Sequence, residues 1–280
     1  MDARKLGPLG PSFLASMDQG ANVFETQEIL RLSCTHHLKP VHFISSLSVL
    51  EGVQEDLVSE DVNIEKNKNL SNGYAESKWV SEKLVLIARK RGIPCNIFRL
   101  PRVGGDSRIG SGPTEDFLWR FVRAALVLQK APQINLYDDL TPVDYICKAI
   151  HFISTKPKWI NSQFHVISPY PLPYSQIFQF LQKRGYHLEW TDETTWKKAL
   201  LAQAAKTNDP NLQALAALFT ETEDIKPISH HFASDHLQSA LKKSHIQCPK
   251  MDKKLLTKYV DFYVRTHFFP TPDYAHQTTA

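Results

Sequence analysis

Two short β-rich segments separated by a long helical stretch constrain the fold of this chain more than any other feature. The segments "VHFIS" (41–45) and "PCNIFRL" (94–100) are short and apolar, as buried strands are. Between them, residues 74–91 have the pattern of a helix that Gly92 ends. Two strands joined through a helix pair in parallel with a right-handed connection. The sequence therefore predicts an α/β fold built on a parallel sheet.

Helical patterns dominate the rest of the chain. The apolar residues Val23, Ile29, Leu30 and Leu32 predict one face of a helix over 22–38, which Lys39-Pro40 would end. We expect further helices over 115–128 and 142–154, extended segments over 133–138 and 163–168, and mostly helix from about residue 173. Asp144 fits a capping carboxylate at a helix start, and residues 51–73 form a polar stretch too long for a simple turn.

These patterns divide the chain into three consecutive parts. We predict an irregular segment over 1–20, an incomplete NAD(P)-binding Rossmann-like domain over 21–170, and a helical substrate-binding region over 171–280. The predicted fold class is therefore a partial Rossmann-like parallel sheet with a mostly helical C-terminal cap.

Composition excludes several classes of protein. No run approaches the roughly 18 apolar residues of a membrane span, and no apolar segment near the N-terminus resembles a secretory signal, so we expect a cytoplasmic protein. The four cysteines are widely spaced, which predicts free buried thiols and neither disulfides nor a zinc site. The paired histidines are adjacent and do not face one another on a helix, and the net charge of +4 comes without a basic stripe. We expect neither a metal nor nucleic acid.

Three side chains of complementary chemistry fall at one edge of the predicted sheet. The first strand ends at Ser45-Ser46, and parallel α/β sheets bind ligands at the carboxyl ends of their strands. Tyr74 and Lys78 are four residues apart at the start of the next helix, so they share one face. An opposite charge nearby lowers the pKa of a tyrosine, ordinarily about 10, by about 1 to 3 units. The phenol then exchanges protons near neutral pH, and we predict that Ser46, Tyr74 and Lys78 are catalytic.

Each of the three residues also has an ordinary structural interpretation. Ser46 can satisfy main-chain groups at a strand end, Tyr74 can be an aromatic residue near a helix start, and Lys78 can be a solvated surface lysine. Taken singly, these interpretations are the better ones. The order of strand hydroxyl, loop, Tyr-x-x-x-Lys helix and second strand favours catalysis for the set.

Longer stretches of the sequence carry a resemblance to a known family. They are "GANVFETQEILRLS" (20–33), "KPVHFISSLSV" (39–49), "GYAESKWVSEKLV" (73–85), "FRLPRVGGDSRIGSGPTEDFLWRFVRAAL" (98–126) and "DDLTPVDYICKAI" (138–150). In content and order they resemble the thioester reductase domains of nonribosomal peptide synthetases and carboxylic acid reductases, which belong to the extended short-chain dehydrogenase/reductase family. The resemblance is close to about residue 150 and looser to about residue 270.

This resemblance implies a function and roles for single residues. The function is the NADPH-dependent reduction of an acyl chain, bound as a phosphopantetheine thioester to an acyl or peptidyl carrier protein, to an aldehyde or an alcohol. Ser46 and Tyr74 would hydrogen-bond the developing oxyanion, and Tyr74 would supply a proton. Lys78 would tune Tyr74 and hold the nicotinamide ribose.

Other residues follow from the resemblance with less chemical detail. Tyr74, Lys78 and Ser45 are predicted to contribute to cofactor binding, and the nicotinamide would be flanked by Leu100, Pro101, Arg102 and Val103. Asn22 matches an asparagine common in the wider family, although a polar residue at a helix start explains it equally well.

The N-terminal part departs from the family pattern. A dinucleotide-binding fold opens with a strand and a glycine-rich turn, whose amides and helix dipole hold the pyrophosphate. In "LGPLGPSFLAS" (6–16) a proline follows each glycine and no β-rich segment leads in. We therefore expect the phosphate-binding loop and the first three strands to be absent, which leaves strand 41–45 with an unpaired edge.

Three functions consequently stay open. The chain is a thioester reductase that works with an upstream polypeptide supplying the cofactor half, or it is a truncated, non-catalytic relative that retains only an interaction with a carrier protein. A nucleotide-sugar epimerase or dehydratase of the extended family is the third alternative, which we rank lower because residues 99–126 follow the reductase pattern.

Overall fold

The chain forms two compact units that interleave in sequence. The computed structural model describes residues 20–67, 70, 72–221 and 231–272. Unit 1 takes the described residues up to 101 together with those of 145–167 and 229–247, and the remainder form unit 2. The sequence predicted consecutive domains with a boundary at 170/171, whereas the structure places 102–144 in unit 2 and 229–247 in unit 1. Of the predicted irregular segment 1–20, all but Gly20 lies outside the described residues.

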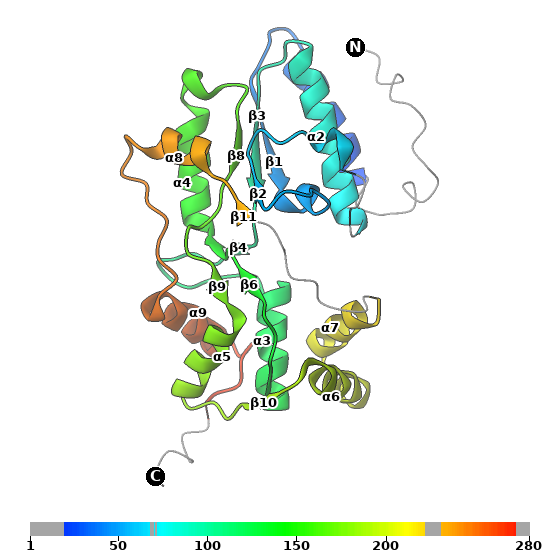
Figure 1. Ribbon diagram of the computed structural model, residues 1–280, viewed down its shortest axis with the longest axis vertical. Coiled ribbons are helices and arrows are strands. Elements are labelled where there is room, and N and C mark those ends of the chain that lie inside the picture. The colour runs from blue at the N-terminus through cyan, green and yellow to red at the C-terminus, as the bar shows by residue number, and fades with distance from the viewer. Residues whose placement is uncertain (1–19, 68–69, 71, 222–230, 273–280) are drawn as a thin grey trace. The chain divides into compact units, whose positions relative to one another are not determined.

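A three-stranded parallel sheet forms the centre of unit 1 (Figure 1). Its strands are β1 (Val41–Ser46), β3 (Cys95–Leu100) and β8 (Gln163–His165), in the order β1-β3-β8. In the β1-β3 register Ser45 lies opposite Arg99 and Ser46 opposite Leu100. The predicted parallel α/β unit is thereby confirmed. Among the described residues β1 pairs with β3 alone, so its other side is a free edge.

Helix α2 (Gly73–Lys90) makes the connection between β1 and β3. It begins at Gly73 because the Asn72 side chain accepts a hydrogen bond from the Ala75 amide at 2.9 Å, which satisfies one of the free donors of the first turn. It ends before Gly92, whose φ of +93° is readily adopted only by glycine. Both predicted ends of this helix are confirmed within one residue.

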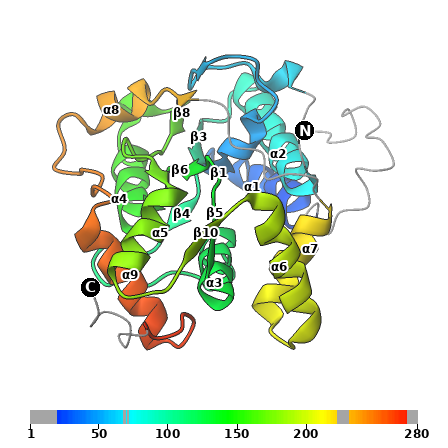
Figure 2. The same ribbon diagram turned by 60° about the horizontal axis from the view of Figure 1, so that its bottom comes forward.

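Helices α1 (Glu25–Ser33) and α2 pack on the same face of the sheet (Figure 2). Alternate side chains of β1 and β3 point to this face and form one apolar cluster with the two helices. A π-helical turn, η3 (Gly20–Phe24), precedes α1 and contributes the buried Val23. The predicted apolar face of this helix is half wrong: Val23 and Leu30 are buried, whereas Ile29 and Leu32 are more than half exposed.

The remaining parts of unit 1 are short. The polar stretch after β1 contains η4 (Leu47–Leu50), β2 (Leu57–Val58) and η5 (Ile64–Lys66), and β2 pairs in parallel with β11 (His231–Phe232). Most of α4 (Val143–Ser154) belongs to this unit, as do η6 (Pro157–Trp159) and α8 (Asp235–Leu241). The long polar loop is thus tied to the sheet domain by a strand from far along the chain.

Unit 2 is mostly helical, as the sequence predicts. Its helices are α3 (Phe117–Leu128), α5 (Tyr174–Lys183), α6 (Glu193–Lys206), α7 (Pro210–Glu221) and α9 (Lys253–Arg265). Three two-stranded pairs accompany them: β4 (Val103–Gly104) with β7 (Thr141–Pro142), β5 (Lys130–Pro132) with β10 (Glu189–Thr191), and β6 (Tyr137–Asp138) with β9 (Leu172–Pro173). An aromatic core that includes Trp119, Phe121 and Trp196 joins these helices, and α6 and α7 lie side by side (Figure 2).

The cysteines are free, but the prediction that they are buried holds only for Cys95. Cys34 and Cys147 are exposed, and Cys248 is partly buried. Within the part of the chain that the structure describes, no helix is both long enough and apolar enough to cross a membrane.

Candidate active site

The carboxyl end of β1 carries the two serines that the sequence singles out. The Ser46 hydroxyl oxygen caps η4, since it accepts hydrogen bonds from the Ser48 amide at 3.2 Å and the Ser48 hydroxyl at 2.9 Å. The structural interpretation of Ser46 is therefore observed. It does not exclude catalysis, because a hydroxyl that accepts two bonds still has its own proton to donate.

Lys78 is anchored to the same strand. Its Nζ donates a hydrogen bond to the Ile44 carbonyl oxygen at 3.3 Å and lies 5.7 Å from the centre of the Phe43 ring, within the range of a cation–π contact. Burial lowers the pKa of Lys78 below that of an ordinary lysine. Lys78 is thus not the solvated surface lysine of the ordinary interpretation. Among the described residues Lys78 Nζ has this one acceptor, which leaves two of its three N–H groups for a ligand.

Tyr74 lies one helical turn before Lys78, on the second residue of α2. Its side chain is 45% exposed, and no hydrogen bond joins its hydroxyl to another described residue. The main chain at this point is fixed, because the Ser77 hydroxyl donates to the Tyr74 carbonyl at 2.9 Å and receives a bond from the Asn22 side chain at 3.0 Å. The helix start is therefore held in place while the phenol stays open to a substrate.

These contacts place the three predicted catalytic residues on two packed elements. Lys78 bonds the main chain of β1 at Ile44, two residues before Ser46. Tyr74 lies one turn before Lys78 on the same face of α2, close to the N-terminal end of the helix. That end of a helix carries partial positive charge, which favours an oxygen that becomes negative during a reaction. The arrangement can polarise a carbonyl group and exchange a proton with it.

The predicted cofactor residues fall into different environments. Ser45 is buried and its hydroxyl donates to the Glu82 carboxylate at 2.5 Å, so a contact of Ser45 with a cofactor would come from its main chain. The first chain segment of unit 1 ends with Leu100 and Pro101, and the first segment of unit 2 begins with Arg102 and Val103. The Arg102 guanidinium binds Asp138 at 2.7 Å and Asp116 at 2.9 Å, which leaves Nη2 as its nitrogen without a hydrogen bond to a described residue.

A fully buried ion pair that was not predicted from the sequence lies next to this site on α2 and β3. The side chains of Glu82 and Arg99 are 0% exposed, and Arg99 Nη2 lies 2.7 Å from a Glu82 carboxylate oxygen. The signal was present in the strand "CNIFRL", because an arginine within an apolar strand requires a buried acceptor. Its partner, Glu82, lies one turn after Lys78 on α2.

His165 on β8 extends this polar cluster. Its Nε2 lies 3.0 Å from Arg99 Nη1, and because arginine has no lone pair to offer, Nε2 accepts and Nδ1–H donates to the Ala233 carbonyl at 2.8 Å. Burial, assisted by the Arg99 charge, lowers the pKa of His165 to about 3. The Glu60 carboxylate accepts the main-chain amides of His165 at 3.0 Å and His236 at 2.6 Å, while burial raises its pKa.

The fit of a nicotinamide cofactor can be tested at both of its ends. At the nicotinamide end, the exposed Tyr74 phenol and the free donors of Lys78 suit a ribose. At the pyrophosphate end, a glycine-rich turn after a strand would be needed. The described residues have one glycine-rich stretch of this kind, 104–112 in unit 2, at the end of β4. There a Cβ on Gly110 would lie 2.1 Å from the Lys258 carbonyl oxygen and one on Gly105 would lie 2.5 Å from that of Ser111. These glycines serve close packing and do not cradle a phosphate.

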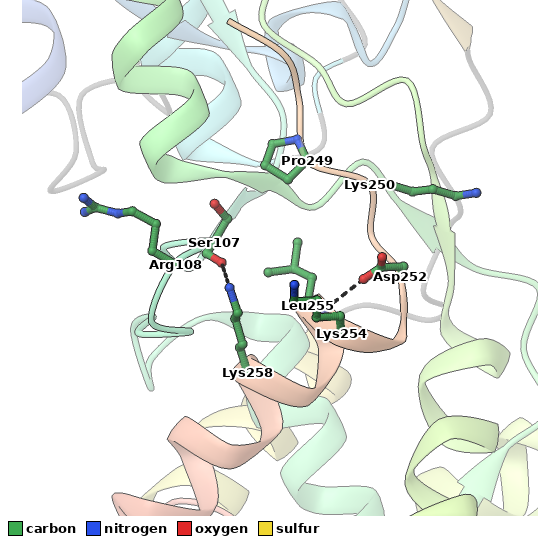
Figure 3. Close-up of a pocket in the computed structure, with 8 residues that line it drawn as sticks. All are labelled: Ser107, Arg108, Pro249, Lys250, Asp252, Lys254, Leu255 and Lys258. Carbon is green, nitrogen blue, oxygen red and sulfur yellow. Dashed lines mark hydrogen bonds between the residues drawn. The ribbon is translucent and has the colours of Figure 1, made fainter.

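A separate hollow of about 430 Å³ lies in unit 2 (Figure 3). Lys258 Nζ donates to the Ser107 carbonyl at 2.8 Å, Asp252 caps the Leu255 amide at 3.0 Å, and the Arg108 side chain points out of the hollow and pairs with Asp106 at 2.7 Å. Ser107 is in turn held by Asp144, which accepts its amide at 2.9 Å and its hydroxyl at 3.0 Å. None of the predicted site residues lines this hollow.

Comparisons with known proteins show which family the chain resembles. The family described as "Male sterility protein", whose domain is NAD-binding, matches residues 15–150. The chain is 34% identical over 251 residues to a linear gramicidin synthase of Brevibacillus parabrevis, an alignment that covers 88% of this chain and 5% of that protein. It is 29% identical over 208 residues to the L-2-aminoadipate reductase of Candida glabrata, covering 69% of this chain and 15% of that one.

A solved structure extends the likeness to the fold. The terminal R domain from the myxalamid PKS-NRPS biosynthetic pathway superposes with a TM-score of 0.85 at 32% identity, covering 91% of this chain and 65% of the R-domain chain. The chain thus spans about two thirds of that domain and a small fraction of the synthetase it matches. It belongs to the terminal reductase domains of nonribosomal peptide synthetases, a group of nicotinamide-dependent oxidoreductases within the extended short-chain dehydrogenase/reductase family.

Proposed function

We propose that this chain carries the catalytic residues of an NADPH-dependent reductase that releases an acyl chain from a carrier-protein thioester. The observation that carries the proposal is the hydrogen bond from Lys78 to the Ile44 carbonyl, which brings the Tyr74-Lys78 helix face to the strand end that bears Ser46. Relatives with more than 30% identity include a linear gramicidin synthase subunit, a glycine betaine reductase and the R domain of the myxalamid PKS-NRPS pathway. Family membership favours this function over the nucleotide-sugar epimerase or dehydratase alternative.

The residues of the chain have defined tasks in this proposal. Ser46 donates its hydroxyl proton in a hydrogen bond to the thioester carbonyl oxygen, and Tyr74 delivers a proton to that oxygen as it becomes negative. The Lys78 ammonium stabilises the resulting phenolate and binds the nicotinamide ribose. NADPH, when bound, supplies the hydride. Loss of the pantetheine thiol then leaves an aldehyde, and a second reduction would give the alcohol.

A polypeptide that completes the sheet is the second part of the proposal. Among the described residues β1 has a neighbour on one side only, and its outward-facing Ile44 is 39% exposed. His42, beside it on the same strand, has a buried Nδ1 atom without a hydrogen-bond partner among the described residues. An upstream α/β polypeptide that adds a strand here would pair with the free edge of β1, cover Ile44 and bring a phosphate-binding turn, which the described residues lack.

Cofactor binding tests the two parts separately. We expect the chain alone to bind NADPH weakly, because the described residues offer a ribose contact but no pyrophosphate cradle. The measurement is a titration of NADPH fluorescence, with Lys78→Ala as the variant that removes the ribose contact. Saturation in the micromolar range would overturn the need for a second polypeptide. The coding sequence upstream supplies an independent test, since the proposal expects a strand followed by a glycine-rich turn there.

The non-catalytic alternative makes a different prediction. A relative that retains only carrier-protein recognition would show no thioester reduction even with the upstream polypeptide present. Turnover in that mixture, lost in Tyr74→Phe, distinguishes the two functions.

A further inference from the structure

Ser45, Glu82 and Arg99 form a buried polar cluster in unit 1 whose side chains the proposed reaction does not use. Ser45 Oγ donates to one Glu82 carboxylate oxygen at 2.5 Å, and Arg99 donates to the other oxygen through Nη2 at 2.7 Å and Nε at 3.1 Å. The Glu82 carboxylate therefore has a partner on each oxygen. We call these three residues the buried clamp.

Each member of the buried clamp stands beside a predicted site residue. Ser45 directly precedes Ser46 on β1, and Arg99 directly precedes Leu100 on β3. On α2, residues 74, 78 and 82 follow one another at intervals of four, so they form a single stripe along the helix. That stripe faces β1, because Lys78 bonds the Ile44 carbonyl and Glu82 bonds the Ser45 hydroxyl. The clamp residues are thus neighbours of predicted site residues on β1, β3 and α2.

The orientation of Arg99 is fixed by acceptors from several elements. Besides Glu82, its nitrogens bond the Glu60 carbonyl oxygen at 3.0 Å and the Gln163 side-chain oxygen at 3.0 Å. A planar guanidinium with this many partners has a single orientation that satisfies them all. Because Glu82 is held in turn by Arg99, the distance between α2 and the two strands is set by directional bonds and not by apolar contact alone.

Stability alone does not account for the buried clamp. Replacing a buried ion pair with apolar residues of similar volume is often neutral or stabilising, since the desolvation of two charges is not fully recovered. The directional bonds of such a pair fix relative position in a way that apolar packing does not. A site that needs a lysine against one particular carbonyl group benefits from that property.

We propose that Glu82 and Arg99, through Ser45, are positioning residues that hold Lys78 against β1 in the geometry that the reaction requires. The expected effect of these residues on turnover rests on the proposed function. The structural part of the inference concerns Lys78 and can be measured without turnover.

The test replaces the clamp without leaving a buried charge. In Glu82→Leu/Arg99→Met one negative and one positive charge are removed together, so the direct electrostatic effect on Lys78 largely cancels. Lys78 is followed by carbon-13 NMR after reductive methylation, with the signal assigned from Lys78→Arg, and the Ile44 carbonyl shift reports the hydrogen bond. The control is Arg123→Met/Asp209→Leu, which removes an ion pair from unit 2.

We expect the clamp variant to move the Lys78 titration toward the ordinary lysine range and to shift the Ile44 carbonyl signal, while the control leaves both unchanged. Where turnover is measurable, a displacement of this kind costs about 10²-fold in kcat. A folded clamp variant with the Lys78 titration and Ile44 signal of the unmodified protein overturns the proposal.

A second variant decides the matter if the first does not fold. Ser45→Ala removes one hydroxyl and no charge, and we expect a smaller change of both signals in the same direction. Unchanged signals in Ser45→Ala would then overturn the proposal. Altered Lys78 signals in variants of a protein that shows no turnover even with its upstream polypeptide present would count against the proposed function and leave the positioning role standing.

Discussion

Two arginines three residues apart, Arg99 and Arg102, illustrate how differently the two units use a charged side chain. Arg99 lies in β3 of unit 1 with a side chain that is 0% exposed, and its partners are Glu82 and groups from the loop and β8. Arg102, in unit 2, is 26% exposed and binds the carboxylates of Asp116 and Asp138. Arg99 connects the elements that carry the predicted catalytic residues. Arg102 connects the segment after β3 to α3 and β6 in the helical unit.

The two clusters also differ in what stands next to them. The partners of Arg99 include Glu82, which lies on the Tyr74-Lys78 stripe of α2. The partner of Arg102, Asp138, instead accepts the Tyr174 hydroxyl at 2.6 Å, and Tyr174 belongs to the aromatic core of unit 2. The comparison indicates that disruption of the Arg99 cluster reaches the predicted catalytic residues Ser46, Tyr74 and Lys78, whereas disruption of the Arg102 cluster stays in unit 2.

We expect the largest loss of unfolding free energy when the arginine of each cluster is replaced. Arg99→Leu leaves the Glu82 carboxylate buried without its cation, which typically costs about 3–5 kcal/mol of unfolding free energy. Arg102→Leu leaves carboxylates that water can reach in part, and we expect a loss of about 1–3 kcal/mol. Urea denaturation of both variants measures the difference. Equal losses would break the comparison.

Acidification should weaken unit 1 through His165. Its pKa is about 3 in the folded protein and ordinarily about 6.5, so between these values the unfolded chain binds the extra proton and stability falls as the pH falls. The loss from this group is on the order of 3 kcal/mol at pH 4. Glu60 works in the opposite direction, because its pKa is raised and the folded state takes up its proton first.

The His165 contribution is isolated by a variant. Denaturation of the unmodified protein and of His165→Gln is compared at pH 7 and pH 4, so that Glu60 contributes to both. We expect the unmodified protein to lose more stability on acidification than the variant. Parallel losses would show that His165 is not the neutral acceptor of Arg99.

The smallest effect is expected at the edge of the Arg102 cluster. Tyr174→Phe removes the hydroxyl that donates to Asp138 but keeps the buried ring and the bond from Arg102 to Asp138, so we expect the cost of one hydrogen bond, about 1 kcal/mol. Hydrogen exchange measures where the loss falls. Protection should decrease in unit 2 and stay unchanged at β1 and α2, and a loss of protection at β1 would contradict the separation of the two clusters.

The parallel sheet was predictable because local patterns determine it. The apolar runs of β1 and β3 and the Gly92 that follows α2 are readable from sequence, and both agree with the structure. The exposure of Ile29 and Leu32 was not predictable. A 3.6-residue period shows that a helix has an apolar stripe, but it does not show which part of the stripe contacts a neighbouring element. The domain boundaries differ for a similar reason, since residues 231–247 join unit 1 through a pairing of β11 with β2 that no local pattern indicates.

The candidate site was predictable in part. Tyr74, Lys78 and Ser46 follow from a spacing within one βαβ unit, and the bond from Lys78 to Ile44 supports their proximity. The buried clamp was not predicted, because the pairing of Glu82 with Arg99 depends on the strand register and on the rotation of α2, neither of which the sequence states. The roles of Ser45 and of residues 100–103 in binding a cofactor stay predictions.

The central claim is that the Tyr74 phenol serves a reductase site. It is tested most directly by the rate of NADPH oxidation with an acyl thioester on a carrier protein, measured for the chain with its upstream polypeptide and for the Tyr74→Phe variant. We predict turnover that falls by about 10² to 10⁴-fold in the variant, while NADPH binding stays largely intact because Lys78 still holds the ribose. Equal rates in the two proteins would remove Tyr74 from the mechanism, and no turnover in either would assign the chain a non-catalytic role.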